Sequence, residues 1–259
     1  MGLPVAGLQI DSAWEDPPAS FARADVLAAG AVAGGARLVV LPEMFATGYS
    51  MAADAIAAHG DAVRRYLAAL AARHGVWVAG GLVEPGAPRP FNACAVFDPH
   101  GAEAGCYRKI HPFSLAGEDR HYAAGTALVT VAVDGLRVTP LICYDLRFPE
   151  PFRAAADRTD LFVVIASWPA ARRQHWSALL RARAIENQAF VLGVNRVGAG
   201  GGLAYVGDSA LVDPLGEVIA TASGQPAVVA GAVDGAAVAE ARARFSFLAD
   251  RRPDVYAGW

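Results

Sequence analysis

The sequence has few cysteines, and their spacing fits neither a disulfide framework nor a zinc site. Its 259 residues include Cys94, Cys106 and Cys143, an odd number at irregular intervals. Disulfide scaffolds carry even numbers of cysteines, and structural zinc sites carry paired ligands. The six histidines show no HExxH or other ligand spacing. The pattern argues against a metal hydrolase, and each cysteine has to be considered by itself.

Long apolar runs and an excess of positive charge are also absent. No run approaches the length that spans a bilayer, and Met1–Asp11 has no basic segment followed by an apolar stretch and cleavage site. The net charge is −3 and the basic residues are scattered, which excludes the electrostatic footprint of a nucleic-acid binder. The pairs Arg172-Arg173 and Arg251-Arg252 are expected to be solvated surface. We expect a cytoplasmic protein that binds neither nucleic acid nor membrane.

The chain does contain enough apolar residues for a large core. Hydrophobic residues make up 54% and charged residues 18%, as in globular proteins. No linker rich in proline, serine or charge divides it. The stretch Gly198–Gly202 lies between two strand candidates with no helix after it, which favours a hairpin tip or mobile loop over a phosphate cradle. We expect residues 1–259 to form a single domain.

Strand-like runs alternate with Ala-rich helical stretches in two rounds. The first round has VAGLQI, a helix from about Pro18 to Ala33, RLVVLPE, a helix from Asp61 to His74, and VWVAGGLVE. The second has NACAVFD and GCYRKI around a turn at Asp98–Gly101, VDGLRVTPLIC, a short helix from Pro149, LFVVIAS, a helix over His175–Asn187, FVLGVNRV and a hairpin through LVDPLGEVIA. This order predicts an α/β protein of two similar halves, with helices covering the sheet.

One cysteine stands where a reactive side chain is expected. Cys143 ends the apolar run VTPLIC and is followed by YDLRFP and helix-like sequence. A turn from strand to helix exposes a side chain and directs backbone N–H groups toward whatever reacts there. Cys94 in NACAVFD and Cys106 in GCYRKI are interpreted as core residues, because cysteines in apolar strands are usually buried.

A nucleophilic cysteine also needs a proton acceptor and a group that stabilises developing negative charge. Glu43 closes LVVLPE, and an acidic residue at the carboxyl end of a strand points into the crevice that α/β sheets use for ligands. Lys109 emerges from GCYRKI and is the candidate cation. Either residue alone would be interpreted as a solvated surface charge. Their joint context with Cys143 points to catalysis.

That context resembles the nitrilase superfamily of carbon–nitrogen hydrolases. LPEMFATGYS surrounds Glu43, YRKIHPF surrounds Lys109 and LICYDLRFPE surrounds Cys143, in the family's order and each at a strand end. The resemblance runs from Gly7 to about Ala220. It implies a four-layer α-β-β-α sandwich, catalysis without a cofactor, and a homodimer or higher homo-oligomer.

The resemblance also implies a catalytic set. The family's glutamate, lysine and cysteine fall on Glu43, Lys109 and Cys143. A second glutamate falls in GEDRHYAAG on Glu118, with the neighbouring Asp119 as the alternative.

Within the family, the chain resembles the bacterial ω-amidases, which hydrolyse the side-chain amide of 2-oxo acids such as 2-oxoglutaramate. The similarity rests on LPEMF, CYDLRFP, the Trp-Pro after LFVVIAS, the HW…ARAIENQ helix and YVGDS. It implies that Arg147 holds the substrate carboxylate, which suits a planar guanidinium that can form two parallel hydrogen bonds. A structural salt bridge with Asp145 or Glu150 is the alternative. The other expected substrate contacts are Tyr144, Trp168 and Tyr49.

The implied mechanism is hydrolysis through a thioester on Cys143. Glu43 takes the thiol proton, the thiolate attacks the amide carbon, and the oxyanion is held by Lys109 and the backbone N–H of Tyr144. Glu43 then protonates the leaving ammonia and deprotonates the water that releases the acid.

Three alternatives remain open. The base could be a histidine, as in a Cys–His pair formed with His111, His121 or His175. The substrate could be an N-carbamoyl amino acid or another amide or nitrile of the superfamily. The chain could also be a catalytically silent binding protein, although the intact catalytic set argues against this.

Overall fold

Two β-sheets form the framework of the protein, which a computed structural model describes over residues 2–256. One sheet has the strand order β13-β1-β2-β3-β4-β5, and the other has the order β10-β11-β9-β8-β7-β6 with β12 paired to β11. The strands are β1 (Leu3–Gln9), β2 (Leu38–Val40), β3 (Trp77–Glu84), β4 (Phe91–Phe97), β5 (Glu103–Arg108), β6 (Val131–Val133), β7 (Leu136–Ile142), β8 (Leu161–Ala166), β9 (Phe190–Asn195), β10 (Val197–Gly200), β11 (Leu203–Val212), β12 (Val218–Ser223) and β13 (Ala227–Val233).

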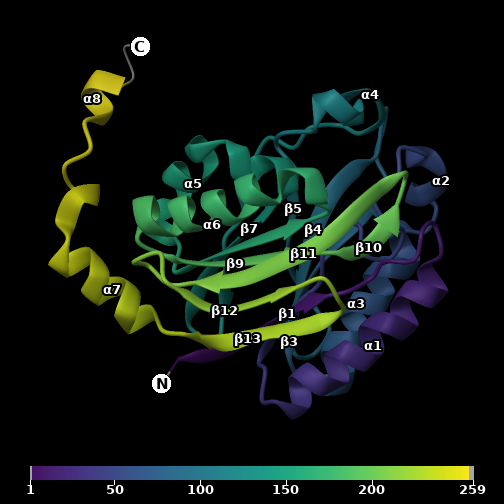
Figure 1. Cartoon of the computed structure of the whole chain (residues 1–259), viewed down its shortest axis with the longest axis horizontal. Coiled ribbons are helices and arrows are strands. Elements are labelled where there is room, and N and C mark those ends of the chain that lie inside the picture. The colour runs from purple at the N-terminus through teal and green to yellow at the C-terminus, as the bar shows by residue number, and fades with distance from the viewer. Residues whose placement is uncertain (1, 257–259) are drawn as a thin grey trace.

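Helices cover the outer faces of the two sheets, which face each other (Figure 1). Helices α1 and α3 lie against the first sheet, and α5 and α6 lie against the second. The α-helices are α1 (Pro17–Ala33), α2 (Ala53–Ala57), α3 (Gly60–His74), α4 (Glu118–His121), α5 (Pro149–Ala155), α6 (Arg173–Asn187), α7 (Gly235–Arg244) and α8 (Pro253–Tyr256). The short 3-10 helices are η1 (Ser114–Ala116), η2 (Cys143–Arg147), η3 (Ala156–Arg158), η4 (Ala170–Arg172) and η5 (Ser246–Leu248). The predicted four-layer α-β-β-α sandwich is confirmed.

Strands β1 and β2 of the first sheet are buried on both faces, because alternate side chains enter different layers. In β1, Val5 lies in the core between the sheets, whereas Ala6 and Leu8 lie in the core under the helices. In β2, Val40 lies between the sheets and Val39 lies under the helices. Since both faces of such a strand need apolar side chains, runs such as RLVVLPE are continuously hydrophobic instead of alternating.

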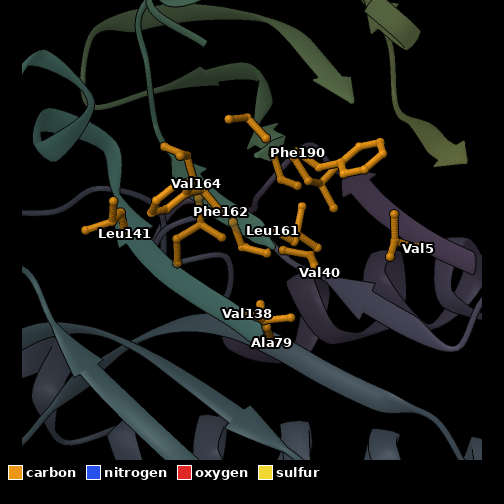
Figure 2. Packing of buried hydrophobic residues seen from close by; sticks show 14 of the residues in the cluster. Val5, Val40, Ala79, Val138, Leu141, Leu161, Phe162, Val164 and Phe190 are labelled. Carbon is orange, nitrogen blue, oxygen red and sulfur yellow. The ribbon is translucent and has the colours of Figure 1, made fainter. Parts of the chain in front are cut away.

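The core between the sheets gathers side chains from both halves of the chain (Figure 2). Val5, Val40 and Ala79 come from the first sheet, and Val138 and Leu161 come from the second. Ala79 and Val138 are 59 positions apart in the sequence and Val5 and Leu161 are 156 apart, so the two halves bury a common apolar surface.

The predicted elements agree with the observed ones except at one hairpin and at several short segments. The run VDGLRVTPLIC, predicted as a single strand, is divided into β6 and β7 by a tight turn. Asp134 and Gly135 have φ values of 44° and 88° in this turn, and an Asp-Gly pair is typical of two-residue hairpins that require positive φ. The hairpin tip predicted at Gly198–Gly202 lies at Gly201-Gly202, between β10 and β11, whereas Gly198 and Gly200 are paired residues of β10. Helices α2, α4, α7 and α8 and strand β13 are not predicted by the pattern.

The direction of the strands brings several of their ends to the same edge of the sandwich. Strands β1, β2 and β3 are parallel, as are β7, β8 and β9. Because β4 is antiparallel to both β3 and β5, the start of β4 lies beside the ends of β3 and β5. Side chains that follow β2, β5, β7 and β8 can therefore meet, as ligand-binding residues do in α/β proteins. No helix in residues 2–256 combines the length and apolar character needed to cross a membrane.

Gly81 of β3 lies directly against the segment that carries Glu43, and we predict that Gly81→Ala destabilises the protein. A Cβ at this position would lie 2.5 Å from the backbone N of Met44, 2.5 Å from the carbonyl O of Pro42 and 2.7 Å from the Cα of Glu43. Since backbone atoms cannot swing aside, the free energy of unfolding should fall by about 1–3 kcal/mol, which lowers the Tm by roughly 2–10 °C. Thermal unfolding followed by circular dichroism measures this.

Gly30 in α1 provides the matched control, because a Cβ there would meet nothing within 4 Å. Gly30→Ala should raise the free energy of unfolding by about 0.5–1 kcal/mol through the better helix propensity of alanine. Equal Tm values for the two variants would contradict the proposed close packing at Gly81.

Candidate active site

Four ionisable side chains meet at the edge of the sandwich where the strands end. Glu43 follows β2, Lys109 directly follows β5, Cys143 directly follows β7 and Glu118 begins α4. Glu43 and Glu118 are fully buried and Lys109 is 1% exposed, whereas Cys143 is partly exposed. The structure therefore brings together the four residues that the sequence indicates as the catalytic set.

The ammonium group of Lys109 lies between two carboxylates. Its Nζ is 2.9 Å from Oε1 of Glu43 and 2.8 and 3.1 Å from the two carboxylate oxygens of Glu118. Burial by itself lowers the pKa of Lys109, but the charges of Glu118 and Glu43 outweigh it, so this pKa lies well above its usual value. Lys109 therefore carries a positive charge at neutral pH.

Glu118, and not Asp119, is the second glutamate of this cluster. The side chain of Asp119 is exposed. Glu118 Oε2 accepts hydrogen bonds from the Tyr49 hydroxyl at 2.9 Å and the backbone N–H of Phe113 at 2.6 Å. Burial raises the pKa of Glu118, but the Lys109 charge and the hydrogen bonds to the carboxylate outweigh it and hold the pKa below its ordinary value. Glu118 is thus a fixed anion opposite Lys109.

Two further residues fix the positions of the glutamates, and no sequence motif indicates either of them. Asn92, at the start of β4, donates from Nδ2 to Glu43 Oε1 at 2.7 Å and to Glu118 Oε1 at 2.8 Å. The backbone N–H of Ser167, directly after β8, donates to Glu43 Oε2 at 2.8 Å. A polar residue inside the apolar strand FNACAVF is the signal that could have found Asn92, because a buried amide needs a partner. Ser167 directly follows β8, just as Cys143 directly follows β7, and this place at the end of an apolar strand is the signal that could have found it.

The backbone at Cys143 is strained. Its φ is 47°, in the left-handed region that residues other than glycine rarely adopt. The turn is held by the buried carboxylate of Asp145, which accepts from the N–H of Ile142 at 3.0 Å, the hydroxyl of Tyr107 at 2.7 Å and the N–H of His111 at 3.1 Å. A strand that turns sharply into a helix in this way is typical of an exposed nucleophile.

Burial and nearby negative charge keep the thiol of Cys143 protonated at rest. Burial is the largest cause that raises the pKa of Cys143 well above its usual value, and Glu43 adds to it, although the charge of Lys109 acts in the opposite direction. The thiol is hydrogen-bonded to the carboxylate of Glu43. Two carboxylates and one ammonium already give the cluster a net charge of about −1 at neutral pH, so a free thiolate would add a second uncompensated charge. The thiolate can therefore form only as its proton moves to an acceptor, and Glu43 is in place to take it.

A pocket opens at Cys143, and its wall contains the expected substrate contacts Tyr49, Tyr144, Arg147 and Trp168. The other lining residues are Phe113, Ala116, Ser167, Pro169, Arg172 and Leu203.

Arg147 forms no salt bridge in the described part of the chain, so neither Asp145 nor Glu150 is its partner. Its guanidinium lies over the ring of Trp168, with Cζ 4.7 Å from the ring centroid, and its Nη2 is 3.2 Å from Nδ1 of His175. The contacts with Trp168 and His175 leave most N–H donors of the Arg147 guanidinium available to a ligand.

The histidines do not support a Cys–His pair. Nδ1 of His111 is 2.8 Å from Oδ1 of Asp145, and its ring stacks on Phe148 at a centroid distance of 4.0 Å. His121 lines a different pocket, and His175 contacts Arg147. No histidine is among the described residues that line the pocket at Cys143. Within residues 2–256, no group of three or more His, Cys, Asp or Glu side chains is arranged to hold a metal ion.

Cys94 and Cys106 lie on β4 and β5, away from this pocket. Cys94 is buried and Cys106 is half-buried, and burial raises the pKa of Cys106 to about 11. Only Cys143 of the three combines a strained turn, a hydrogen bond to a carboxylate and an opening to a pocket.

Solved structures similar to this chain have the same fold. A CN-hydrolase superfamily protein from Xanthomonas campestris, with an arsenic adduct in its active site, superposes with a TM-score of 0.91 at 37% identity, covering 97% of this chain and 98% of that chain. An amidase from Nesterenkonia sp. AN1 in complex with acrylamide superposes with a TM-score of 0.89 at 26% identity, covering 100% and 97%.

Sequence comparison agrees with the structural comparison. The chain is 41% identical over 246 residues to an omega-amidase of Escherichia coli, covering 94% of both chains. It is 35% identical over 225 residues to a 2-oxoglutaramate amidase of Bacillus subtilis, covering 85% of this chain and 87% of that protein. The model of the carbon-nitrogen hydrolase family matches residues 4–243, which extends the predicted resemblance at both ends. This chain therefore belongs to the carbon–nitrogen hydrolase family.

Proposed function

We propose that this protein is an amidase that hydrolyses the terminal amide of a small 2-oxo acid, such as 2-oxoglutaramate, to the carboxylic acid and ammonia. The observation that carries the proposal is the buried cluster of Glu43, Lys109 and Glu118 next to Cys143, at the base of a pocket whose wall carries Arg147. The names of the omega-amidase and 2-oxoglutaramate amidase relatives support the choice of substrate.

The first half of the reaction forms a thioester. As the amide carbon approaches Cys143, its thiol proton moves to Glu43 and the sulfur attacks the carbonyl carbon. The oxyanion that develops is stabilised by the ammonium of Lys109 and the backbone N–H of Tyr144. The tetrahedral intermediate collapses when Glu43 returns the proton to the amide nitrogen, so ammonia leaves and the acyl group stays on sulfur.

The second half of the reaction hydrolyses the thioester. Glu43 removes a proton from a water molecule, the hydroxide attacks the thioester carbon, and the same oxyanion stabilisers act again. The thiolate leaves and recovers its proton, which frees the acid product. Glu118 does not exchange protons in this scheme. Its role is to keep Lys109 charged and in place, since it accepts two hydrogen bonds from that ammonium.

Arg147 gives the pocket its preference for an anion. A 2-oxo acid amide carries its carboxylate at the end remote from the reacting amide, and the guanidinium can hold that carboxylate through two parallel hydrogen bonds. Trp168 supports the guanidinium from one side, with Cζ 4.7 Å from the ring centroid. The position of Arg147 four residues after the nucleophile, within η2, links recognition of the remote end to the turn that carries Cys143.

We further propose that residues 1–259 act as one cytoplasmic domain that assembles into a homodimer or higher homo-oligomer and needs no cofactor. Exposed apolar side chains support assembly: Ile185 on α6 is 46% exposed and Phe247 in η5 is 44% exposed. Sedimentation velocity on the purified chain measures the oligomeric state.

Cys143→Ala should abolish turnover and leave the fold intact, because it removes the sulfur that forms the thioester and little else. Cys106→Ala is the matched control and should keep its activity. Iodoacetamide labelling, located by mass spectrometry, should inactivate the enzyme in step with modification of Cys143. Inactivation while Cys143 remains unlabelled would refute the assignment of the nucleophile.

Glu43→Gln should lower kcat by on the order of a thousandfold, because it removes the proton acceptor and preserves the shape of the side chain. The negative charge of Glu43 raises the pKa of Cys143, so this variant should also have a lower thiol pKa and form the thiolate at lower pH. Ultraviolet absorbance of the thiolate against pH measures that change.

If Glu43→Gln forms more thiolate and yet turns over more slowly, the role of Glu43 is to transfer protons during the reaction and not only to activate the sulfur. Lys109→Met should shift the pKa of Cys143 in the opposite direction, since the charge of Lys109 lowers it. Near-normal kcat in Glu43→Gln would overturn the mechanism.

Arg147→Lys should raise the KM for 2-oxoglutaramate by roughly one to two orders of magnitude, because it keeps the charge but loses the fork of donors. A small neutral amide has no carboxylate to bind, so its turnover should change little. Ammonia release measures both. Equal losses for the two amides would make Arg147 a structural residue, and a wild-type preference for an N-carbamoyl amino acid would replace the proposed substrate.

A further inference from the structure

Arg172 is a second guanidinium on the wall of the pocket. The sequence pattern predicts that the Arg172-Arg173 pair is solvated surface, but the structure places Arg172, half-buried, in the same pocket lining as Cys143 and Arg147. Its Cζ lies 5.4 Å from the centroid of the Phe113 ring. Within residues 2–256, no hydrogen bond or ion pair joins its guanidinium to a protein acceptor. Its donors are therefore available to a ligand.

The neighbouring Arg173, unlike Arg172, forms an ion pair within the protein. Its Nε and Nη2 bind the two carboxylate oxygens of Asp208 at 2.9 and 2.8 Å. Arg172 ends η4 instead, and its carbonyl oxygen accepts the indole N–H of Trp168 at 2.9 Å. Because Trp168 also lines the pocket and lies under Arg147, this hydrogen bond ties the backbone of Arg172 to the wall that carries the first guanidinium.

Charge is divided sharply between the buried cluster next to Cys143 and the wall of the pocket. In the cluster, which is not part of the pocket lining, Glu43 and Glu118 are buried and both are bound to Lys109. At the wall, Arg147 and Arg172 face the pocket, and no carboxylate is among the described residues that line it. A ligand group next to these arginines therefore meets two positive charges and no negative one.

A single carboxylate does not use all the donors of two guanidiniums. Arg147 alone can bind both oxygens of a carboxylate through its fork. In a 2-oxo acid, the carbonyl oxygen on the adjacent carbon supplies one more acceptor, next to the carboxylate. In an amino acid of the same length, that carbon carries an ammonium group, which donates hydrogen bonds and is repelled by both arginines.

We propose that Arg172 binds the 2-oxo group and the adjacent carboxylate oxygen of the substrate, and that it makes the enzyme select a 2-oxo acid amide over the amino acid amide of the same length. This inference rests on the proposed function, because it assumes that the carboxylate end of the substrate lies at Arg147. The amide of either molecule would reach Cys143 equally well, so the selection arises at the remote end.

Four amides that differ only at the remote end test this. 2-Oxoglutaramate, glutaramate and glutamine carry an oxo group, a methylene and an ammonium at the same carbon, and pentanamide carries no charge. Ammonia release gives kcat and KM for the wild type, Arg172→Met and Arg172→Lys. Arg158→Met is the matched control for loss of one positive charge. Arg158 is exposed in η3, which precedes β8, and the pocket residues Ser167 and Trp168 follow β8, so Arg158 lies at the opposite end of this strand from the pocket.

Arg172→Met should lower kcat/KM for 2-oxoglutaramate by about 10- to 100-fold, mostly through KM, the size expected for a lost hydrogen bond to a charged group. The loss should be smaller for glutaramate, which has no oxo group, and smallest for pentanamide. For glutamine, relief of the repulsion offsets the weaker carboxylate contact, so the preference for 2-oxoglutaramate over glutamine should shrink by about tenfold or more. Arg172→Lys should keep the discrimination against glutamine and lose part of the binding of the oxo group. Arg158→Met should match the wild type on all four.

The outcomes that overturn the inference are distinct from those that overturn the proposed function. An equal loss for all four amides, pentanamide included, would make Arg172 a structural residue. An equal loss for the three charged amides would show that Arg172 does not distinguish the groups at that carbon. If the wild type itself shows no preference for 2-oxoglutaramate over pentanamide, the proposed function fails, and this inference fails with it. Circular dichroism verifies that each variant is folded.

Discussion

A buried lysine ammonium between two carboxylates is the interaction on which the rest of the site depends. Lys109 is 1% exposed and is bonded to the fully buried Glu43 and Glu118. Breaking a buried ion pair by removing one partner typically costs about 3–5 kcal/mol, because the other charge stays buried without compensation. The three side chains therefore fix one another, and with them the segment after β2, the end of β5 and the start of α4.

The scaffold satisfies the other polar atoms of the glutamates with donors that cannot change their charge. An amide, Asn92, bridges the two carboxylates, and a backbone N–H, that of Ser167, binds the remaining oxygen of Glu43. Neutral donors hold the geometry and leave the charge of the cluster unchanged. Glu43 is consequently held in place beside Cys143, whose raised pKa keeps the thiol protonated at rest. This arrangement suits an enzyme that must transfer the same proton in both directions.

Charge is divided between the buried cluster next to Cys143 and the wall of the pocket, and the proposed function uses this division to orient the substrate. In that proposal, Lys109, whose own charge is balanced by carboxylates, stabilises the oxyanion. The wall carries Arg147 and Arg172 without carboxylate partners among the described residues. The proposal therefore assigns recognition of the remote end to η2 and η4, and the chemistry at the reacting amide to the strand ends. Under this assignment, a ligand with an anionic end binds productively in only one direction.

The sequence by itself predicted the fold and the proposed catalytic set, because both predictions depend on local signals. Alternating apolar runs and helical stretches predict two α/β halves, and the motifs that carry the family resemblance, which implies the four layers and the catalytic set, are each contiguous in the chain. Tertiary structure alone decided between Glu118 and Asp119, since adjacent acidic residues have the same local pattern and differ only in which one faces Lys109. It also brought Asn92 to the two glutamates and Arg172 to the pocket at Cys143, although these residues lie 17 residues before Lys109 and 29 residues after Cys143 in the sequence. Their hydrogen-bond partners and pocket neighbours come from other strands and turns, and only the packing of the two sheets brings these segments together.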